Sequence, residues 1–76
     1  MVIDLLVTKS LDGFSAEIPS IKGCETWAAD EEIALQKILD LASFYLKIPV
    51  KKFSIDKARI EDSIITYKLI FNKEQL

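Results

Sequence analysis

The sequence predicts an α+β domain, in which one helix packs on one face of a mainly antiparallel sheet in the order β-β-β-α-β-β. Stretches of alternating apolar and polar residues near both ends of the chain indicate half-buried strands. Between them, apolar residues recur at helical spacing after an acidic residue that suits a helix start. An Asp-Gly dipeptide early in the chain indicates a tight hairpin, which makes the first two strands antiparallel neighbours.

The first part of the chain contains three predicted strands. Asp12-Gly13 turns the chain, because glycine tolerates the positive φ that such turns require. Pro19 ends the returning strand, since proline has no amide hydrogen to donate to a sheet. A loop over residues 20–23 leads to the third strand. The three strands are predicted at residues 3–11, 14–18 and 24–28.

A helix is predicted over residues 31–47. Asp30 stands at the N-cap, where its carboxylate accepts hydrogen bonds from free backbone amides. Glu31 and Glu32 follow in the first turn, where negative charge opposes the positive end of the helix dipole, and Pro49 ends the element. The buried stripe is predicted from apolar residues at helical spacing: Ala34, Leu35, Ile38, Leu41, Ala42 and Tyr45.

The remainder of the chain predicts two more strands, at residues 52–60 and 64–71. The last one alternates most regularly. A short helix that begins at Pro49 is the alternative for the start of this region. One face of the last strand is predicted to carry Ile65, Tyr67, Leu69 and Phe71.

Size and composition indicate a single domain over residues 1–76. Half of the residues are hydrophobic, so either the core is unusually full or another subunit covers apolar surface. The net charge is −2, but residues 1–49 carry −4 and residues 50–76 carry +2. The acidic first part suits a basic partner. No leader or membrane span is predicted, so we expect a cytoplasmic protein without membrane contact.

The residue types do not favour an enzyme, a metal site or a cofactor. The chain has no histidine, and its two glycines cannot build a phosphate-binding loop. Cys24 is a single cysteine on a predicted inward position, which favours a core residue over a nucleophile. Asp4, Glu17 and Glu25 are the candidate acids of a two-metal nuclease. Asp4 and Glu17 fall on predicted solvent faces, so we expect no catalysis from them.

Residues 14–46 combine several features in one uninterrupted segment. An aromatic residue opens the short strand "FSAEIP", the loop "SIKGC" reaches a Gly-Cys pair, and a threonine follows two residues later. The helix then opens with an acidic residue before Ala-Leu. In these features the segment resembles the HicB-type antitoxin domain. The matching positions are Phe14, Pro19, Gly23, Cys24, Thr26, Glu32, Ala34 and Leu35.

The resemblance implies a partial RNase H-like fold without catalytic acids, which acts by covering the active surface of another protein. The partner that it implies is a HicA-like toxin, a small basic RNase, and the assembly that it implies is a homodimer or a higher oligomer. Many members of the family continue into a DNA-binding domain. Because the residues after Pro49 predict strands, we do not expect DNA binding here.

The residues expected to contact a protein partner lie at the strand–helix junction and along the helix. Leu6, Trp27, Ile33 and Phe44 have no place in the predicted core, and aromatic residues are enriched at interface centres. The predicted contact residues are Glu25, Trp27, Glu31, Ile33 and Phe44.

Two other functions remain open. The same fold could inhibit another nuclease or a host-defence complex. Alternatively, the more basic second part of the chain could bind nucleic acid, with its basic residues on the phosphates. The residues for that alternative are Lys51, Lys52, Lys57 and Arg59.

Overall fold

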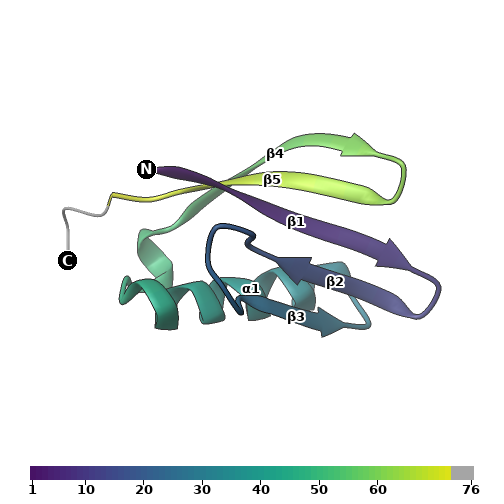
Figure 1. The fold of residues 1–76 in the computed structure, drawn as a ribbon, viewed down its shortest axis with the longest axis horizontal. Coiled ribbons are helices and arrows are strands. Elements are labelled where there is room, and N and C mark those ends of the chain that lie inside the picture. Colours follow the sequence, from purple (N-terminus) through teal and green to yellow (C-terminus); the bar gives the residue numbers. More distant parts are fainter. Residues whose placement is uncertain (73–76) are drawn as a thin grey trace.

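The computed structural model describes residues 1–72 and confirms the predicted fold class. One antiparallel sheet has the strand order β3-β2-β1-β5-β4, and one long helix connects β3 with β4 (Figure 1). The N-terminal strand therefore lies at the centre of the sheet, between β2 and β5. The elements are β1 (Val2–Ser10), β2 (Gly13–Glu17), β3 (Glu25–Ala28), α1 (Glu31–Leu46), the 3₁₀ turn η1 (Val50–Lys52), β4 (Ser54–Glu61) and β5 (Ile64–Ile70).

The helix begins and ends where the sequence predicts, within one residue. Asp30 has an extended backbone, and its side chain accepts a hydrogen bond of 3.3 Å from the amide of Glu32. At the other end, Lys47 adopts the left-handed conformation with φ 59°, and its amide donates to the carbonyl oxygen of Ser43. The Ser43 hydroxyl donates to the carbonyl oxygen of Ile48 at 2.6 Å, which secures the turn after the helix.

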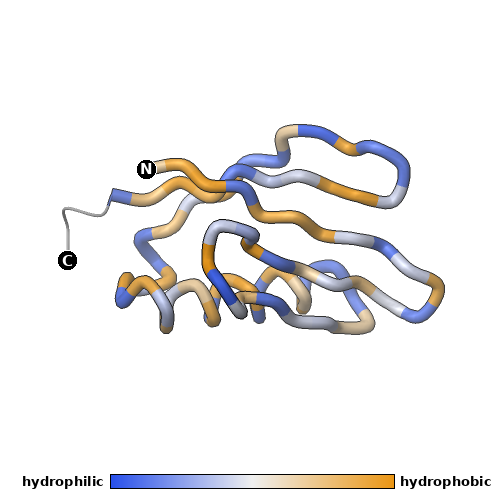
Figure 2. Tube along the Cα trace, in the orientation of Figure 1, coloured by the Kyte–Doolittle hydropathy of each residue, from blue (hydrophilic) through white to orange (hydrophobic). Residues whose placement is uncertain are grey.

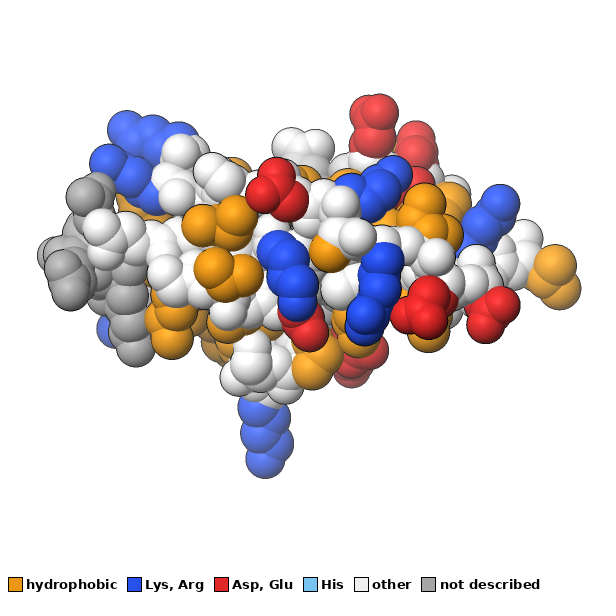
Figure 3. All heavy atoms as spheres, turned by 90° about the horizontal axis from the view of Figure 1, so that it is seen from above, with side chains coloured by type: hydrophobic (Ala, Val, Ile, Leu, Met, Phe, Trp, Pro, Cys, Tyr) orange, Lys and Arg blue, Asp and Glu red, His pale blue; other side chains and the backbone are white. Residues whose placement is uncertain are grey.

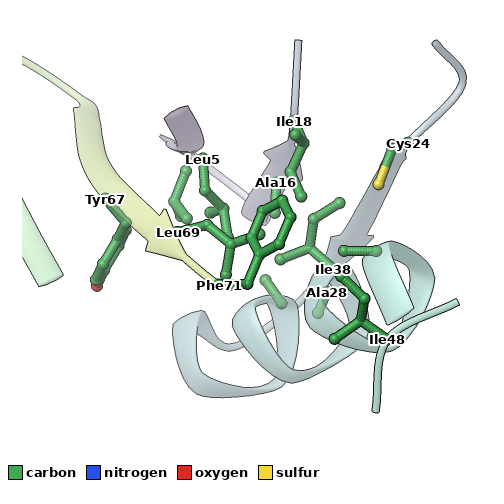
Figure 4. Packing of buried hydrophobic residues seen from close by; sticks show 13 residues of the cluster. Leu5, Ala16, Ile18, Cys24, Ala28, Ile38, Ile48, Tyr67, Leu69 and Phe71 are labelled. Carbon is green, nitrogen blue, oxygen red and sulfur yellow. The ribbon is translucent and has the colours of Figure 1, made fainter. Parts of the chain in front are cut away.

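The helix covers only part of the sheet. It packs mainly on β3 and β2 and touches β1, while β4 and β5 extend beyond it (Figure 1). Two alanines and one isoleucine at helical spacing, Ala34, Ile38 and Ala42, are fully buried and let the helix lie close to the strands. Figure 4 shows Ile38 of the helix among the inward side chains of the sheet. The buried hydrophobic residues of the strands and loops are Leu5, Val7, Ala16, Ile18, Cys24, Ala28, Ile48, Tyr67, Leu69 and Phe71.

One residue of the predicted helix stripe is exposed, while Leu35 and Leu41 are half-buried against the core. Tyr45 is 45% exposed, and its ring makes an edge contact with that of Phe44 at 5.7 Å between centroids. Its hydroxyl would lie 3.4 Å from a Cβ placed on Gly23, so the ring reaches the loop before β3 and not the sheet. The prediction of a buried Tyr45 was therefore wrong, because the last helical turn lies over this loop.

The segment before the last strand contains a short helical turn followed by a strand, so both predicted alternatives occur, one after the other. Pro49 begins a single 3₁₀ turn, η1, and β4 starts two residues after the predicted strand boundary, at Ser54. The register with β5 shifts between Lys57 and Arg59, so β4 contains a bulge. Figure 2 shows that β4 is largely hydrophilic, in contrast to the hydrophobic course of β1.

A hydrogen bond joins the first turn of the helix to the uncovered half of the sheet. The Tyr67 hydroxyl on β5 donates to Glu31 Oε2 at 2.6 Å. Burial and the adjacent Glu31 carboxylate raise the pKa of Tyr67 from its ordinary value of 10.0 to about 12. The neutral phenol is thus favoured in the folded state.

We expect this contact to make the fold sensitive to alkaline pH. Because the pKa of Tyr67 is higher in the folded state, its contribution to stability is complete below pH 10 and is lost as the pH rises to about 12. Denaturant unfolding at pH 8 and pH 11 should show a larger loss for the wild type than for Tyr67→Phe. Tyr45→Phe, which keeps Tyr67, should behave like the wild type. Equal losses of stability in all three proteins would contradict a stabilising contact between Tyr67 and Glu31.

Candidate interaction surface

The face of the sheet that points away from the helix carries an acidic and aromatic patch at β2 and β3. Strand alternation places Glu25 and Trp27 of β3 on this face, together with Ser15 and Glu17 of β2. In the register, Glu17 is opposite Glu25 and Ser15 is opposite Trp27. We call these four residues the outer patch. They line an open hollow of about 400 Å³, together with Ala16 and Thr26.

The indole ring of Trp27 is held in place by contact with β2. The residue is 48% exposed, and the buried part of its ring lies over Gly13. A Cβ on Gly13 would approach Trp27 Cζ2 to 2.5 Å and the carbonyl oxygen of Ala28 to 2.6 Å. Only glycine permits this close approach, so Gly13 positions the ring at the rim of the hollow.

Within residues 1–72, the two carboxylates of the outer patch form no ion pair. Glu17 and Glu25 are directly opposite on neighbouring strands, where like charges repel. Within residues 1–72, the ion pairs lie elsewhere, between Arg59 and Glu61 and between Lys68 and Asp4. No group of three or more acidic, cysteine or histidine residues in this range could hold a metal ion. The pair is therefore suited to a cation from another molecule.

Ile33 and Phe44 lie on the exposed flank of the helix and not beside the outer patch. They are 49% and 77% exposed, respectively. Their helical positions lie on the same side as Lys37, whose ammonium group donates to the carbonyl oxygen of Trp27 at 3.2 Å. This flank therefore borders the outer edge of β3. Four of the five predicted contact residues, all except Glu31, thus occupy two surfaces that meet along β3.

Glu31 is separated from the other predicted contact residues. Its carboxylate accepts the hydrogen bond from Tyr67 and faces β5, whereas Ile33 and Phe44 face the β3 side. The structure thus gives Glu31 an intramolecular partner. The residue that lies beside Glu25 is Glu17, which the sequence indicated only as a candidate acid of a nuclease. Strand alternation on both sides of the loop was the signal that placed Glu17 and Glu25 on one face.

The four basic residues of the nucleic-acid alternative do not share one face. Lys51 and Lys52 lie in η1. Lys57 points to the helix side of the sheet, with its ammonium group 5.8 Å from the centroid of the Tyr67 ring. Arg59 points to the opposite side and forms an ion pair of 3.1 Å with Glu61. Figure 3 shows basic, acidic and hydrophobic side chains interspersed on the view onto β4.

Cys24, the candidate nucleophile, and Asp4, the candidate acid on β1, both have structural roles in the fold. Cys24 is buried, and burial raises the pKa of its thiol, so the less nucleophilic thiol form is favoured. Asp4 is paired with Lys68 across the β1–β5 ladder. Glu17 is opposite Leu6 and not opposite Asp4. The register therefore does not align the Asp4 and Glu17 carboxylates.

Comparisons with protein-family models, with curated proteins and with solved structures found no match. Among residues 1–72, no helix has the length and apolar character needed to cross a membrane. Function is therefore inferred from the sequence and from the surface of the molecule.

We expect Gly13→Ala to destabilise the fold by about 1–3 kcal/mol, because the added methyl group overlaps the Trp27 ring and a backbone oxygen. Denaturant unfolding gives the stability, and the fluorescence of the single tryptophan reports the displaced ring. Gly23→Ala is the comparison: its Cβ meets only Tyr45 at 3.4 Å, so it should leave the tryptophan emission unchanged. An unchanged emission in Gly13→Ala would contradict the ring position.

Proposed function

We propose that this protein is a non-enzymatic interaction module of the antitoxin type, which binds and neutralises a small basic partner protein such as a HicA-like RNase toxin. The observation that carries the proposal is the outer patch, in which the unneutralised carboxylates of Glu17 and Glu25 lie beside the half-exposed ring of Trp27. An arginine or lysine of the partner fits this arrangement.

The chemistry of the outer patch favours a guanidinium or ammonium group. Two carboxylates accept its hydrogen bonds, and the face of an indole ring attracts a cation placed over it. Binding also removes the repulsion between Glu17 and Glu25. A hollow of about 400 Å³ accepts one side chain of this size without rearrangement of the strands.

The exposed apolar residues of the helix supply the second half of the contact. Ile33 and Phe44 lie on the flank that borders β3, and β3 is an edge strand. A partner that passes over this edge can touch the flank and the outer patch together. The apolar contact then adds affinity, while the charges of the outer patch select a basic partner.

The sequence resemblance supports the same region. The segment that resembles the HicB-type antitoxin domain, residues 14–46, corresponds to β2, β3 and α1. These elements carry the outer patch and the helix flank. An antitoxin acts by covering the surface of its partner, which needs no reactive group of its own. The proposal therefore combines the resemblance, the acidic patch and the exposed apolar residues.

The test starts from the neighbouring reading frame in the source genome, where we expect a short basic protein. Co-expression with this chain should restore growth that the basic protein arrests. Glu25→Lys should weaken the complex at least about tenfold, equivalent to about 1.4 kcal/mol, because it places a positive charge in the outer patch. Calorimetric titration of the two purified proteins measures this change.

Glu61→Lys is the matched control, since it makes the same substitution at the end of β4, on the edge of the sheet opposite β3. It should bind like the wild type. Equal weakening by both substitutions would indicate a general charge effect and contradict a specific patch. Binding to RNA that Lys51→Glu abolishes would instead support the nucleic-acid alternative.

A further inference from the structure

The sheet has one long edge that lacks a neighbour within residues 1–72. The strand order puts β3 and β4 at the two edges. β3 has only four residues, and the Lys37 ammonium group occupies its Trp27 carbonyl oxygen. β4 has eight residues, nearly all of them exposed. Long unpaired edges are templates for pairing with another strand.

The register shows which backbone groups of β4 point outward. The amide of Phe71 donates to Met1, and that of Lys9 donates to Ser63, so odd-numbered residues of the last strand bond toward β1. Even-numbered residues of β5 therefore bond toward β4. Their opposite residues on β4 are Ser54, Asp56, Arg59 and Glu61. The amides and carbonyls of Ile55, Lys57 and Ile60 consequently face the open edge.

The bulge brings two isoleucines of β4 to the same face. Ile55 is opposite Leu69 and Ile60 is opposite Ile65, so both point to the helix side of the sheet. In a regular strand, residues five apart would point to opposite faces. By the same shift, Asp56 and Arg59 both point to the outer side. The extra residue, Ala58, thus makes the strand self-complementary when it runs against a copy of itself.

We propose that β4 pairs antiparallel with β4 of a second copy of this chain, around a twofold axis near Lys57 and Ala58. Ile55 then meets Ile60 of the second copy, and their outward backbone groups form a hydrogen-bonded pair. On the other face, Asp56 meets Arg59 of the second copy. Each contact occurs twice, and the two sheets join into one continuous sheet.

The rest of the structure leaves room for this pairing and complements it. The helix packs on β3, β2 and β1, so it does not obstruct the β4 edge (Figure 1). Basic Lys51 lies just before the strand, whereas Glu61 and Asp62 end it. Antiparallel pairing places Glu61 opposite Ser54 of the second copy, so the acidic end of one strand lies toward the basic turn η1 of the other. Ile60, which is 62% exposed in one chain, gains an apolar neighbour.

Charges and bulges on an edge strand can also prevent pairing. On β4, in contrast, the charges of Asp56 and Arg59 become complementary in the one register that also matches the isoleucines and the outward backbone groups. The two Lys57 side chains flank the axis on the other face, each near its own Tyr67 ring. This agreement of three independent features favours a second copy of the chain as the occupant. The proposal does not depend on binding of the basic partner at β3.

The test is a charge exchange between two variants, measured by sedimentation equilibrium over a range of concentrations. The wild type should reach twice the 8.6 kDa mass of one chain. Asp56→Arg and Arg59→Asp should each remain at the mass of one chain, because each places two like-charged pairs in the homodimer. An equimolar mixture should return to twice that mass, since both pairs become complementary in the heterodimer.

The controls separate this interface from the fold and from the partner site. Each variant is first checked by thermal unfolding, because Asp56 lies opposite Lys68 within the same chain. A substitution that only destabilises its own chain would do so in the mixture as well. Return of the dimer in the mixture therefore identifies a contact between the two chains. Ile33→Lys, on the helix flank, should dimerise like the wild type. A wild type that stays monomeric up to about 1 mM, a dimer that survives both substitutions, or a mixture that stays monomeric would each overturn the proposal.

Discussion

The structure depends on the limited reach of one helix. A helix of sixteen residues is about 24 Å long, and its buried stripe of Ala34, Ile38 and Ala42 lies close to β2 and β3. A single element of this size cannot cover both faces of a five-stranded sheet. One face of the sheet and one edge therefore remain accessible. The two proposed interactions use these accessible parts, and a fully covered sheet would offer neither.

The regular elements were predictable because each is specified by local sequence. The hairpin follows from Asp12-Gly13, the helix start from Asp30, and the strand faces from alternation, so the α+β order and the inward residues of β5 were correct. Tyr45 was misplaced because helical spacing does not reveal that the last turn lies over a loop. The bulge at Ala58 was also missed, since no residue in this stretch distinguishes a bulged strand from a regular one.

The candidate site was only partly predictable, because it depends on register between strands. Sequence alone placed Trp27 and Glu25 outside the core, but the contact of Trp27 with Gly13 requires β2 and β3 to be aligned. Glu31 illustrates the opposite case. Its position in the first turn of the helix suggested a free acidic rim, whereas the folded chain brings the Tyr67 hydroxyl to it from a strand far along the sequence.

The central position of β1 affects the order in which the chain can fold. Val2 lies opposite Ile70 and Thr8 lies opposite Ile64, so the middle of the sheet joins segments that lie far apart in the sequence. During synthesis on the ribosome, β1 and β2 can form their hairpin early, but β1 must wait until β3, the helix and β4 have been made before β5 arrives. Contacts of such long sequence separation slow folding. The nascent protein therefore carries an incomplete sheet, which makes this stage the most exposed to misassembly.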